Sequence, residues 1–299
     1  MKKIISLLLF CLSTCSFGKD IRLIVPYSPG GFSDIVARAV QRQLAEANVT
    51  TIVEYKPGAG GGIGFNYVAK TKSETVLVIA SNQLTDGVDV NPTDSPNIET
   101  DFKFIKHLGT VPPYLLVSES SGIKSLRELN VLSKKRTIYY GSAGIGSGLH
   151  ISAAIAINGN NNFVHVPFKG GADGFMSLMR DDIQFLMESE AVFEQHIGKK
   201  IRPIAVLASR RTANYPQVAT LREQGINDYN YTRWFVLASN STISLGEKSA
   251  ITEKLNSNSF LHELSKIGLT KASTDVKDNF LVEQAANFKA IQRTVNLNQ

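Results

Sequence analysis

Three glycine-rich turns are the segments of this chain whose residue types could bind a small ligand. They span residues 27–34, 58–64 and 141–148, and each follows an apolar run typical of a strand. Glycine lets the backbone bend sharply and removes the side chain, so peptide N–H groups can point at a ligand. Each turn also leads into a segment with helical spacing, whose unpaired N-terminal N–H groups favour an anion. Together the turns predict a site of main-chain donors able to hold a carboxylate.

These turns have two other interpretations. Each turn could be only a tight strand-to-helix connection, with no ligand at all. A dinucleotide loop is disfavoured, because G-x-G-G-G-x-G at 58–64 does not match G-x-G-x-x-G, and the chain has no G-K-[ST] phosphate loop.

Side chains near the turns allow both a binding and a structural interpretation. Ser28, Ser33, Ser142 and Ser147 offer hydroxyl groups to an anion, but each could equally cap a helix or form a turn. Ser33 in particular is placed to be the N-cap of the first helix. Lys169 could pair with a ligand carboxylate or be solvated.

Other polar residues favour structural roles. His150 and His165 have no second ligand at metal spacing, so we expect His150 to pack against or orient its loop. Trp234 is expected to pack in the core or hinge, and the alternative is that it stacks on the ligand.

No catalytic constellation is present in the sequence. There is no G-x-S-x-G elbow around the serines, no cysteine nucleophile after residue 15 and no zinc motif. The acidic neighbours Asp181 and Asp182, and Glu188 and Glu190, are interpreted as surface charges. The sequence therefore predicts a protein that is not an enzyme and has no cofactor or metal.

The elements that position the turns alternate between strand and helix, which predicts an α/β fold with parallel sheets covered on both faces. The pattern from residue 21 to 80 repeats from about residue 125, and extended crossings are expected near 115–119 and 230–235. This layout is typical of a two-lobed clamp with a hinge. We assign residues 19–116 and 235–299 to lobe 1, and 117–234 to lobe 2.

The N-terminus has the order of a secretory signal: two lysines, a short apolar run at 4–12, then small residues. Cleavage is expected after residue 18. The alternative is a lipoprotein anchored at Cys15. Both cysteines, Cys11 and Cys15, precede that cleavage site, so the mature chain would contain no thiol or disulfide.

The charge balance is mildly basic, with a formal net charge of +6. The basic residues are scattered, and no basic stripe with interleaved aromatic residues exists, which argues against a nucleic-acid partner. The excess positive charge favours anionic ligands in general.

Several blocks together closely resemble the substrate-binding proteins of tripartite tricarboxylate transporters, the Bug family. They are IRLIVPYSPGG at 21–31 with Asp34, EYKPGAGG at 54–61, GSAGIGS at 141–147 with His150, HVPFKGG at 165–171, and a scattered set comprising Arg211, Pro216, Thr220, Glu223, Gln224, Gly225 and Trp234. The blocks follow the family's order and cover nearly all of the mature chain.

The resemblance implies a periplasmic, Venus flytrap-type fold resembling type II binding proteins, with a hinge of two extended crossings, and a small carboxylate as ligand. It implies a monomer that closes around a dicarboxylate, a tricarboxylate, an acidic amino acid or an aromatic acid. The ligand contacts that it implies are Tyr27, Ser28, Gly30, Gly31, Phe32, Ser33, Asp34, Gly60, Gly61, Gly62, Ser81, Asn82, Ser142, Gly146, Ser147, Lys169 and Gly170.

The implied partners are the small and large membrane subunits of such a transporter. The alternative role is a ligand-sensing component of a two-component signalling system. The chain departs from the family at Phe32, which could shape the pocket. The stretch 86–100 lacks the usual tyrosine-aspartate-proline signature, residues 158–162 are unusually polar, and residues 180–182 replace a glycine-containing turn. These differences leave the identity of the ligand open.

Overall fold

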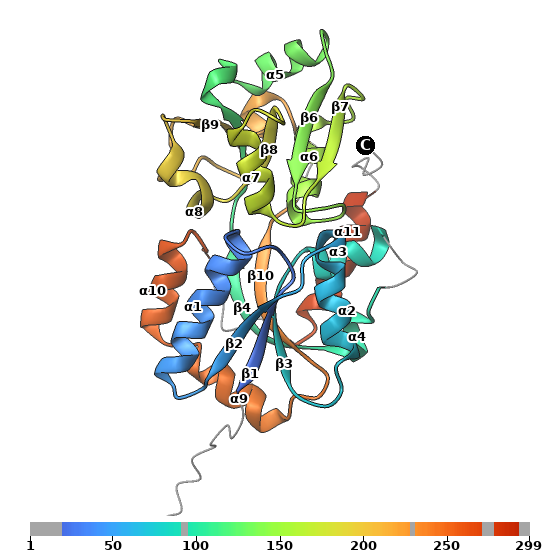
Figure 1. Cartoon of the computed structure of the whole chain (residues 1–299), viewed down its shortest axis with the longest axis vertical. Coiled ribbons are helices and arrows are strands. Elements are labelled where there is room, and N and C mark those ends of the chain that lie inside the picture. The colour runs from blue at the N-terminus through green and yellow to red at the C-terminus, as the bar shows by residue number, and fades with distance from the viewer. Residues whose placement is uncertain (1–19, 91–94, 228–230, 271–277, 293–299) are drawn as a thin grey trace, which may run out of the picture.

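A computed structural model describes residues 20–90, 95–227, 231–270 and 278–292. The predicted signal segment, residues 1–18, lies outside this part of the chain. Two five-stranded mixed sheets, each with its helices, lie one above the other along the long axis (Figure 1). The predicted two-lobed α/β fold is confirmed. The prediction that the sheets are parallel is wrong in part, because β10 (Trp234–Asn240) in one sheet and β5 (Tyr114–Ser118) in the other run antiparallel to both of their neighbours.

The sheet of the first lobe has the order β2-β1-β3-β10-β4. Strands β1 (Ile21–Val25), β2 (Thr51–Tyr55) and β3 (Val76–Ser81) are parallel, while β10 (Trp234–Asn240) is antiparallel to both β3 and β4 (Phe102–Thr110). Leu23 and Ile24 belong to the two different apolar clusters that cover the two faces of the sheet. A strand buried on both faces needs a continuous apolar run, which IRLIV supplies apart from Arg22.

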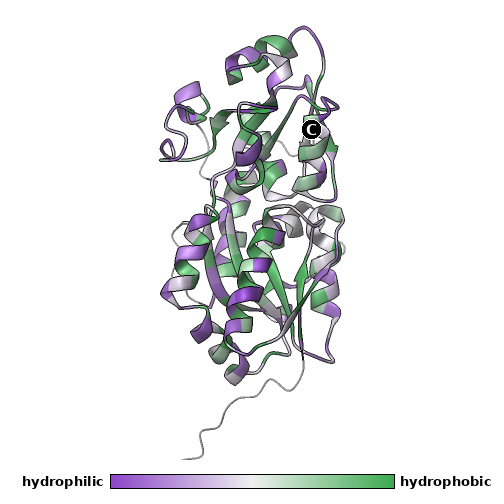
Figure 2. Cartoon of the chain, turned by 60° about the vertical axis from the view of Figure 1, so that its left-hand side comes forward, coloured by the Kyte–Doolittle hydropathy of each residue, from purple (hydrophilic) through white to green (hydrophobic). Residues whose placement is uncertain are grey.

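Helices cover both faces of this sheet, and Figure 2 shows hydrophobic residues concentrated on the strands that they enclose. The helices packed around this sheet are α1 (Phe32–Glu46), α2 (Gly62–Lys70), α3 (Gln83–Val90), α4 (Ile98–Asp101), α9 (Leu245–Lys254) and α10 (Asn258–Lys266). The short 3₁₀ helix η1 (Ala59–Gly61) precedes α2.

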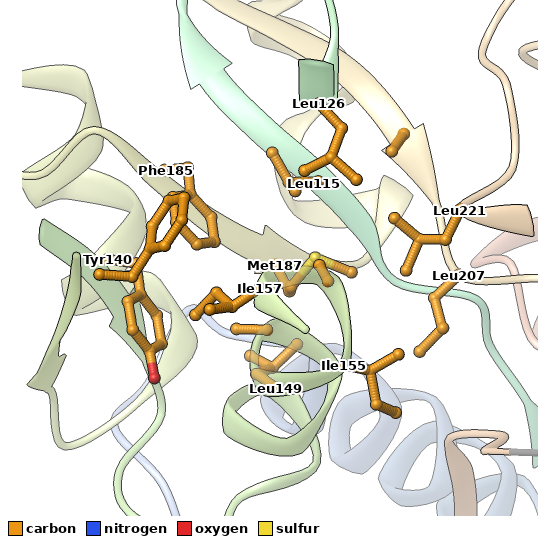
Figure 3. Packing of buried hydrophobic residues seen from close by; sticks show 14 of the residues in the cluster. Leu115, Leu126, Tyr140, Leu149, Ile155, Ile157, Phe185, Met187, Leu207 and Leu221 are labelled. Atoms are coloured by element: carbon orange, nitrogen blue, oxygen red, sulfur yellow. The ribbon is translucent and has the colours of Figure 1, made fainter. Parts of the chain in front are cut away.

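The second lobe has the sheet order β7-β6-β8-β5-β9. Its strands are β5 (Tyr114–Ser118), β6 (Ile138–Ser142), β7 (Phe163–Pro167), β8 (Phe185–Glu188) and β9 (Ile201–Val206). Its helical segments are α5 (Leu126–Ser133), α6 (Gly148–Ile157), α7 (Gly171–Met179), α8 (Glu190–Phe193), η3 (Glu119–Ser121), η4 (Glu194–His196) and η5 (Arg222–Gln224). Every residue of α6 is buried, as expected for a helix that is apolar all round. Figure 3 shows Leu149, Ile155 and Ile157 from this helix in the same apolar cluster as Phe185 and Met187.

The chain passes between the sheets at residues 111–113 and 231–233, and these two crossings are bonded to each other. The Val111 N–H donates to the carbonyl oxygen of Arg233 at 3.0 Å. Residues 115–119, where the first crossing was expected, lie mostly in β5.

A third connection between the lobes comes from the C-terminal helix α11 (Phe280–Gln292). It packs on α3 and α4 of the first lobe, and Leu281 is buried in that lobe's core. Phe288, two turns further along, is buried in the core of the second lobe. The helix therefore spans the junction of the lobes.

Candidate functional site

A small cavity lies between the two lobes, at the ends of strands that precede helix N-termini. It has a volume of about 20 Å³ and is lined by Tyr27, Gly31, Phe32, Ser33, Ser81, Ala143, Ser147, Gly148, Leu149, Gly171, Glu188 and Arg233. A cavity of this size holds about one water molecule. A ligand with several carbon atoms can therefore enter only when the lobes move apart.

Three helix N-termini meet at this cavity. Gly31 is the N-cap of α1, Ser147 is the N-cap of α6, and Gly171 is the first residue of α7. The unpaired N–H groups and dipoles of such termini favour negative charge. Ser33, which was predicted to be the N-cap of α1, instead lies in its first turn, because Gly31 adopts the extended N-cap conformation.

The two lobes touch directly beside the cavity. The Ser28 N–H donates to the Lys169 carbonyl oxygen at 3.3 Å, and the Ser28 hydroxyl donates to Asp173 at 2.7 Å. Gly170 lies against the Ser28 backbone. The side chain of Lys169 itself is exposed, so its contact with the first lobe is made by its backbone.

A second contact joins the glycine turns of the two lobes. A Cβ atom added at Gly60 would lie 2.3 Å from the Ile145 carbonyl oxygen, and one added at Gly144 would lie 2.7 Å from Gly60 Cα. Both glycines also have positive φ angles, 62° and 108°. Glycine is thus required here by backbone geometry and by the close approach of the lobes. Gly61 and Gly62 continue this turn into α2, and Gly62 does not line the cavity.

Asp34 holds the first turn in shape. One of its carboxylate oxygens accepts from the Gly30 N–H at 2.9 Å, and the other accepts from the Tyr55 hydroxyl at 2.8 Å. Arg38 also pairs with it at 3.3 Å. Asp34 and Gly30 were predicted to contact the ligand, but in this structure their polar groups are bonded to each other.

The first-lobe wall of the cavity is uncharged. Tyr27 is buried, and its burial raises its pKa to about 12, so the hydroxyl stays protonated and can donate a hydrogen bond. Ser81 lines the cavity beside it, whereas Asn82 does not. The Asn82 side chain donates to Thr232 O and accepts from the Trp234 N–H, which fixes the crossing at residues 231–233.

Two predicted contacts in the second lobe hold their own loop. The Ser142 hydroxyl is 2.7 Å from Nε2 of His165, and the Gly146 N–H donates to Nδ1 of His150 at 3.1 Å. The two imidazole rings stack with centroids 4.1 Å apart. Burial, aided by His150, lowers the pKa of His165 to about 3, so this ring is neutral. His150 orients the loop, as its position predicted.

Apart from Gly61 and Gly62, which continue the second glycine turn into α2, the predicted residues fall into three groups. Tyr27, Gly31, Phe32, Ser33, Ser81 and Ser147 line the cavity. A second group lies where the lobes touch: Ser28, Gly30, Gly60, Lys169 and Gly170. Asp34, Asn82, Ser142 and Gly146 hold the surrounding loops.

Two charged residues of the cavity wall were not predicted. Glu188, interpreted from the sequence as a surface charge, is 0% exposed at the end of β8, and Arg233 is 6% exposed at the crossing before β10. Burial raises the pKa of Glu188 and lowers that of Arg233, while each charge acts in the opposite direction on the other. The sequence held a signal for Glu188, because this residue is at the carboxyl end of an apolar strand, where ligands bind in open α/β sheets.

Other kinds of site find no support in the described part of the chain. No group of three or more histidine, cysteine, aspartate or glutamate side chains there could hold a metal ion. None of the helices in residues 20–90, 95–227, 231–270 and 278–292 is both long and apolar enough to cross a membrane.

Comparisons with known proteins agree with this arrangement. The family model "Tripartite tricarboxylate transporter family receptor" matches residues 35–297. The BugT protein of Bordetella pertussis is 25% identical over 289 residues, which cover 92% of this chain and 89% of BugT. A UPF0065 protein of a Pseudomonas strain is 27% identical over 72% of this chain and 66% of its own length.

Solved structures show the same fold. An R. palustris protein solved with adipate has a TM-score of 0.84 at 22% identity, covering 92% of this chain and 96% of its own. MatC of Rhodopseudomonas palustris, solved with malate, has a TM-score of 0.81 at 20% identity over 91% and 98% of the two chains. The periplasmic binding protein BugD has a TM-score of 0.84 at 19% identity over 92% and 96%.

Proposed function

Because the chain belongs to the tripartite tricarboxylate transporter receptor family, we propose that it is a periplasmic protein that captures a small organic anion between two closing lobes and delivers it to a membrane transporter. The family is one of substrate-binding receptors, so the chain is a receptor and not an enzyme.

The observation that carries this proposal is the convergence of three helix N-termini on one interlobe cavity. The caps at Gly31, Ser147 and Gly170 come from both lobes, so a carboxylate among them would contact the first and the second lobe together. A ligand that binds the closed arrangement more tightly than the open one shifts the population towards closure. The neutral Tyr27 hydroxyl and Ser81 add donors without adding charge.

The contacts between the lobes indicate how the protein could open to admit the ligand. Entry requires separation of the lobes, because the cavity of about 20 Å³ is too small for an organic acid. The Ser28 contacts with Lys169 and Asp173 and the approach of Gly60 to the loop at 144–145 would have to open beside the cavity. The bonded crossings at 111–113 and 231–233 are where the chain would bend.

Similar structures with adipate and malate support a carboxylate as the ligand class. Such a ligand in this chain would place one carboxylate among the helix N-termini and the rest of the molecule against the side-chain walls. Main-chain donors recognise the carboxylate that many acids share, so the walls would set selectivity. The family's description as a transporter receptor supports delivery to the membrane subunits of a tripartite transporter.

A thermal-shift screen tests the proposal. The protein is first unfolded and refolded to strip any bound solute, and is then mixed with succinate, malate, citrate, adipate, glutamate, aspartate, nicotinate and benzoate in turn. A ligand present at a hundred times its Kd stabilises the fold by about 2.7 kcal/mol. We expect a rise of several degrees in Tm with at least one acid. A flat response to every acid, from folded and stripped protein, would contradict the proposal.

A further inference from the structure

The cavity wall holds two buried charges whose polar atoms are incompletely bonded. Glu188 Oε1 accepts from the Ser189 N–H at 2.7 Å, while its Oε2 has no partner. Arg233 donates from Nη1 to the Ser189 hydroxyl at 2.8 Å, while its Nε has no partner. Unsatisfied buried charged groups are costly, so their presence in a cavity wall indicates a ligand.

These two side chains do not satisfy each other. No ion pair with an N···O distance of 4.0 Å or less joins Glu188 to Arg233. Each instead lies near a different helix N-terminus. A Cβ atom added at Gly171, the first residue of α7, would lie 2.1 Å from Glu188 Oε2, and one added at Gly148, the first residue of α6, would lie 3.4 Å from Arg233 Nε.

The charge of the surroundings limits what can bind. Asp86, also buried, accepts from the hydroxyl of Tyr231, and Tyr231 precedes Arg233 in the same crossing. Among the described residues, the buried charged side chains in this region are therefore two carboxyl groups, of Glu188 and Asp86, and the guanidinium group of Arg233. A dicarboxylate or tricarboxylate would bring further negative charge beside Glu188, and like charges at low dielectric repel strongly.

We propose that the ligand of this site is a small amino carboxylate, whose ammonium group bonds to Glu188 Oε2 while its carboxylate bonds to Arg233 Nε and the helix N-termini. This inference rests on the proposed function and narrows its ligand class. The ammonium group would satisfy the unpartnered carboxylate oxygen, and the ligand carboxylate would satisfy the unpartnered guanidinium nitrogen. Both bonds are charge-assisted and therefore strong.

The experiment compares amino acids with analogues that lack the amino group. Calorimetry on the stripped, refolded protein measures the Kd of three pairs: glutamate and glutarate, aspartate and succinate, and 4-aminobutyrate and butyrate. We expect the amino compound of the best-binding pair to bind about tenfold to a hundredfold more tightly than its analogue. Glu188→Gln should abolish that preference, because an amide cannot pair with an ammonium ion as a carboxylate does.

A matched control is available two residues away. Glu190 is partly buried in the same lobe but bonds to Asn214 and does not line the cavity, so Glu190→Gln should keep the full preference. Arg233→Gln should weaken both members of the pair, because both carry the carboxylate.

The outcomes separate this inference from the function on which it rests. Equal or tighter binding of the analogue by the unaltered protein would overturn the inference and leave carboxylate capture standing. So would a preference that survives Glu188→Gln, since Glu188 would then not be the ammonium acceptor. Failure of all six compounds to bind folded protein that still binds another acid of the thermal-shift panel would overturn the inference alone, whereas failure of every acid tested would overturn both.

Discussion

The two walls of the cavity differ in how they can recognise a ligand. The first-lobe wall consists of glycine, serine, tyrosine and phenylalanine and carries no charge, so it offers N–H and O–H donors to any carboxylate. The opposite wall and the crossing contribute Glu188 and Arg233, both buried and incompletely bonded. The two walls therefore have different roles in our proposal: the neutral wall binds the carboxylate that many acids share, and the charged wall determines which acid is preferred.

Preventing the close approach of the two lobes should have the largest effect on ligand binding. In Gly60→Ala the new methyl group meets the Ile145 carbonyl oxygen of the other lobe, so closure is hindered while the open form is not. We expect the Kd measured by calorimetry to rise by at least about tenfold. The left-handed φ of Gly60 adds a stability cost of about 1 kcal/mol.

Gly122→Ala is the matched control for this change. Gly122 has a similar φ of 67° but nothing within 4 Å of an added Cβ atom. It should lose similar stability and keep its affinity. If both variants bound equally well, contact between the glycine turns would play no part in binding.

Loosening the neutral wall should have a smaller effect. The two carboxylate oxygens of Asp34 accept from the Gly30 N–H and the Tyr55 hydroxyl, one each. Asp34→Asn replaces one of these oxygens by an N–H₂ group, which cannot accept, so one of the two hydrogen bonds is lost. We expect a loss of about 1 kcal/mol in the free energy of unfolding and a severalfold weaker affinity. Asp278→Asn, at an exposed pair with Lys248, should change neither quantity in the same urea and calorimetry measurements.

The buried Glu188 in the charged wall should make the stability of the protein depend on pH. Burial raises the pKa of Glu188 above its ordinary value of 4.5, so its cost to the fold is absent below that pH and grows as pH rises. Glu188→Gln does not ionise. Its Tm without ligand should therefore match that of the unaltered protein near pH 4 and exceed it at neutral pH. A constant difference across this range would show that Glu188 is not held in an unfavourable charged state.

An exposed glutamate of the same lobe should behave in the opposite way, with the smallest effect. Hydrogen bonds from Arg211 and Thr220 lower the pKa of Glu223 to about 2. Its stabilising contribution is complete above pH 4.5 and is lost as pH falls through about 2. Glu223→Gln should thus lower Tm slightly at neutral pH and by progressively less towards pH 2 in the same scans. A deficit that persisted at pH 2 would contradict this sign.

The glycine turns on both sides of the cavity could be predicted from the sequence because their features are local. A strand, a glycine turn and a helix with apolar spacing place Gly31 and Ser147 at helix N-termini without knowledge of distant contacts. The apolar strands likewise predicted the α/β sheets of both lobes. It was harder to predict which residues of each loop face the ligand and which hold the loop in place. Asp34 and Ser142 hold their loops, because they bond to Tyr55 and His165 on neighbouring strands.

The charged wall could not be predicted in the same way. Glu188 and Arg233 are 45 residues apart, and a lone acidic or basic residue is usually exposed. Their burial depends on how β8 of one lobe faces the crossing that enters β10 of the other. Sequence spacing carries no information on that arrangement.

The most direct test of lobe closure is a distance measurement between the lobes. The chain from residue 19 onward has no cysteine, so spin labels can be placed at Ile52→Cys in the first lobe and Val131→Cys in the second, where both native side chains are about half exposed. Electron paramagnetic resonance then gives the distance distribution with and without the acid that raises Tm most. Ligand-driven closure predicts a shift to a shorter and narrower distribution at saturation. An unchanged distribution, with binding confirmed by calorimetry on the labelled protein, would contradict closure around the ligand.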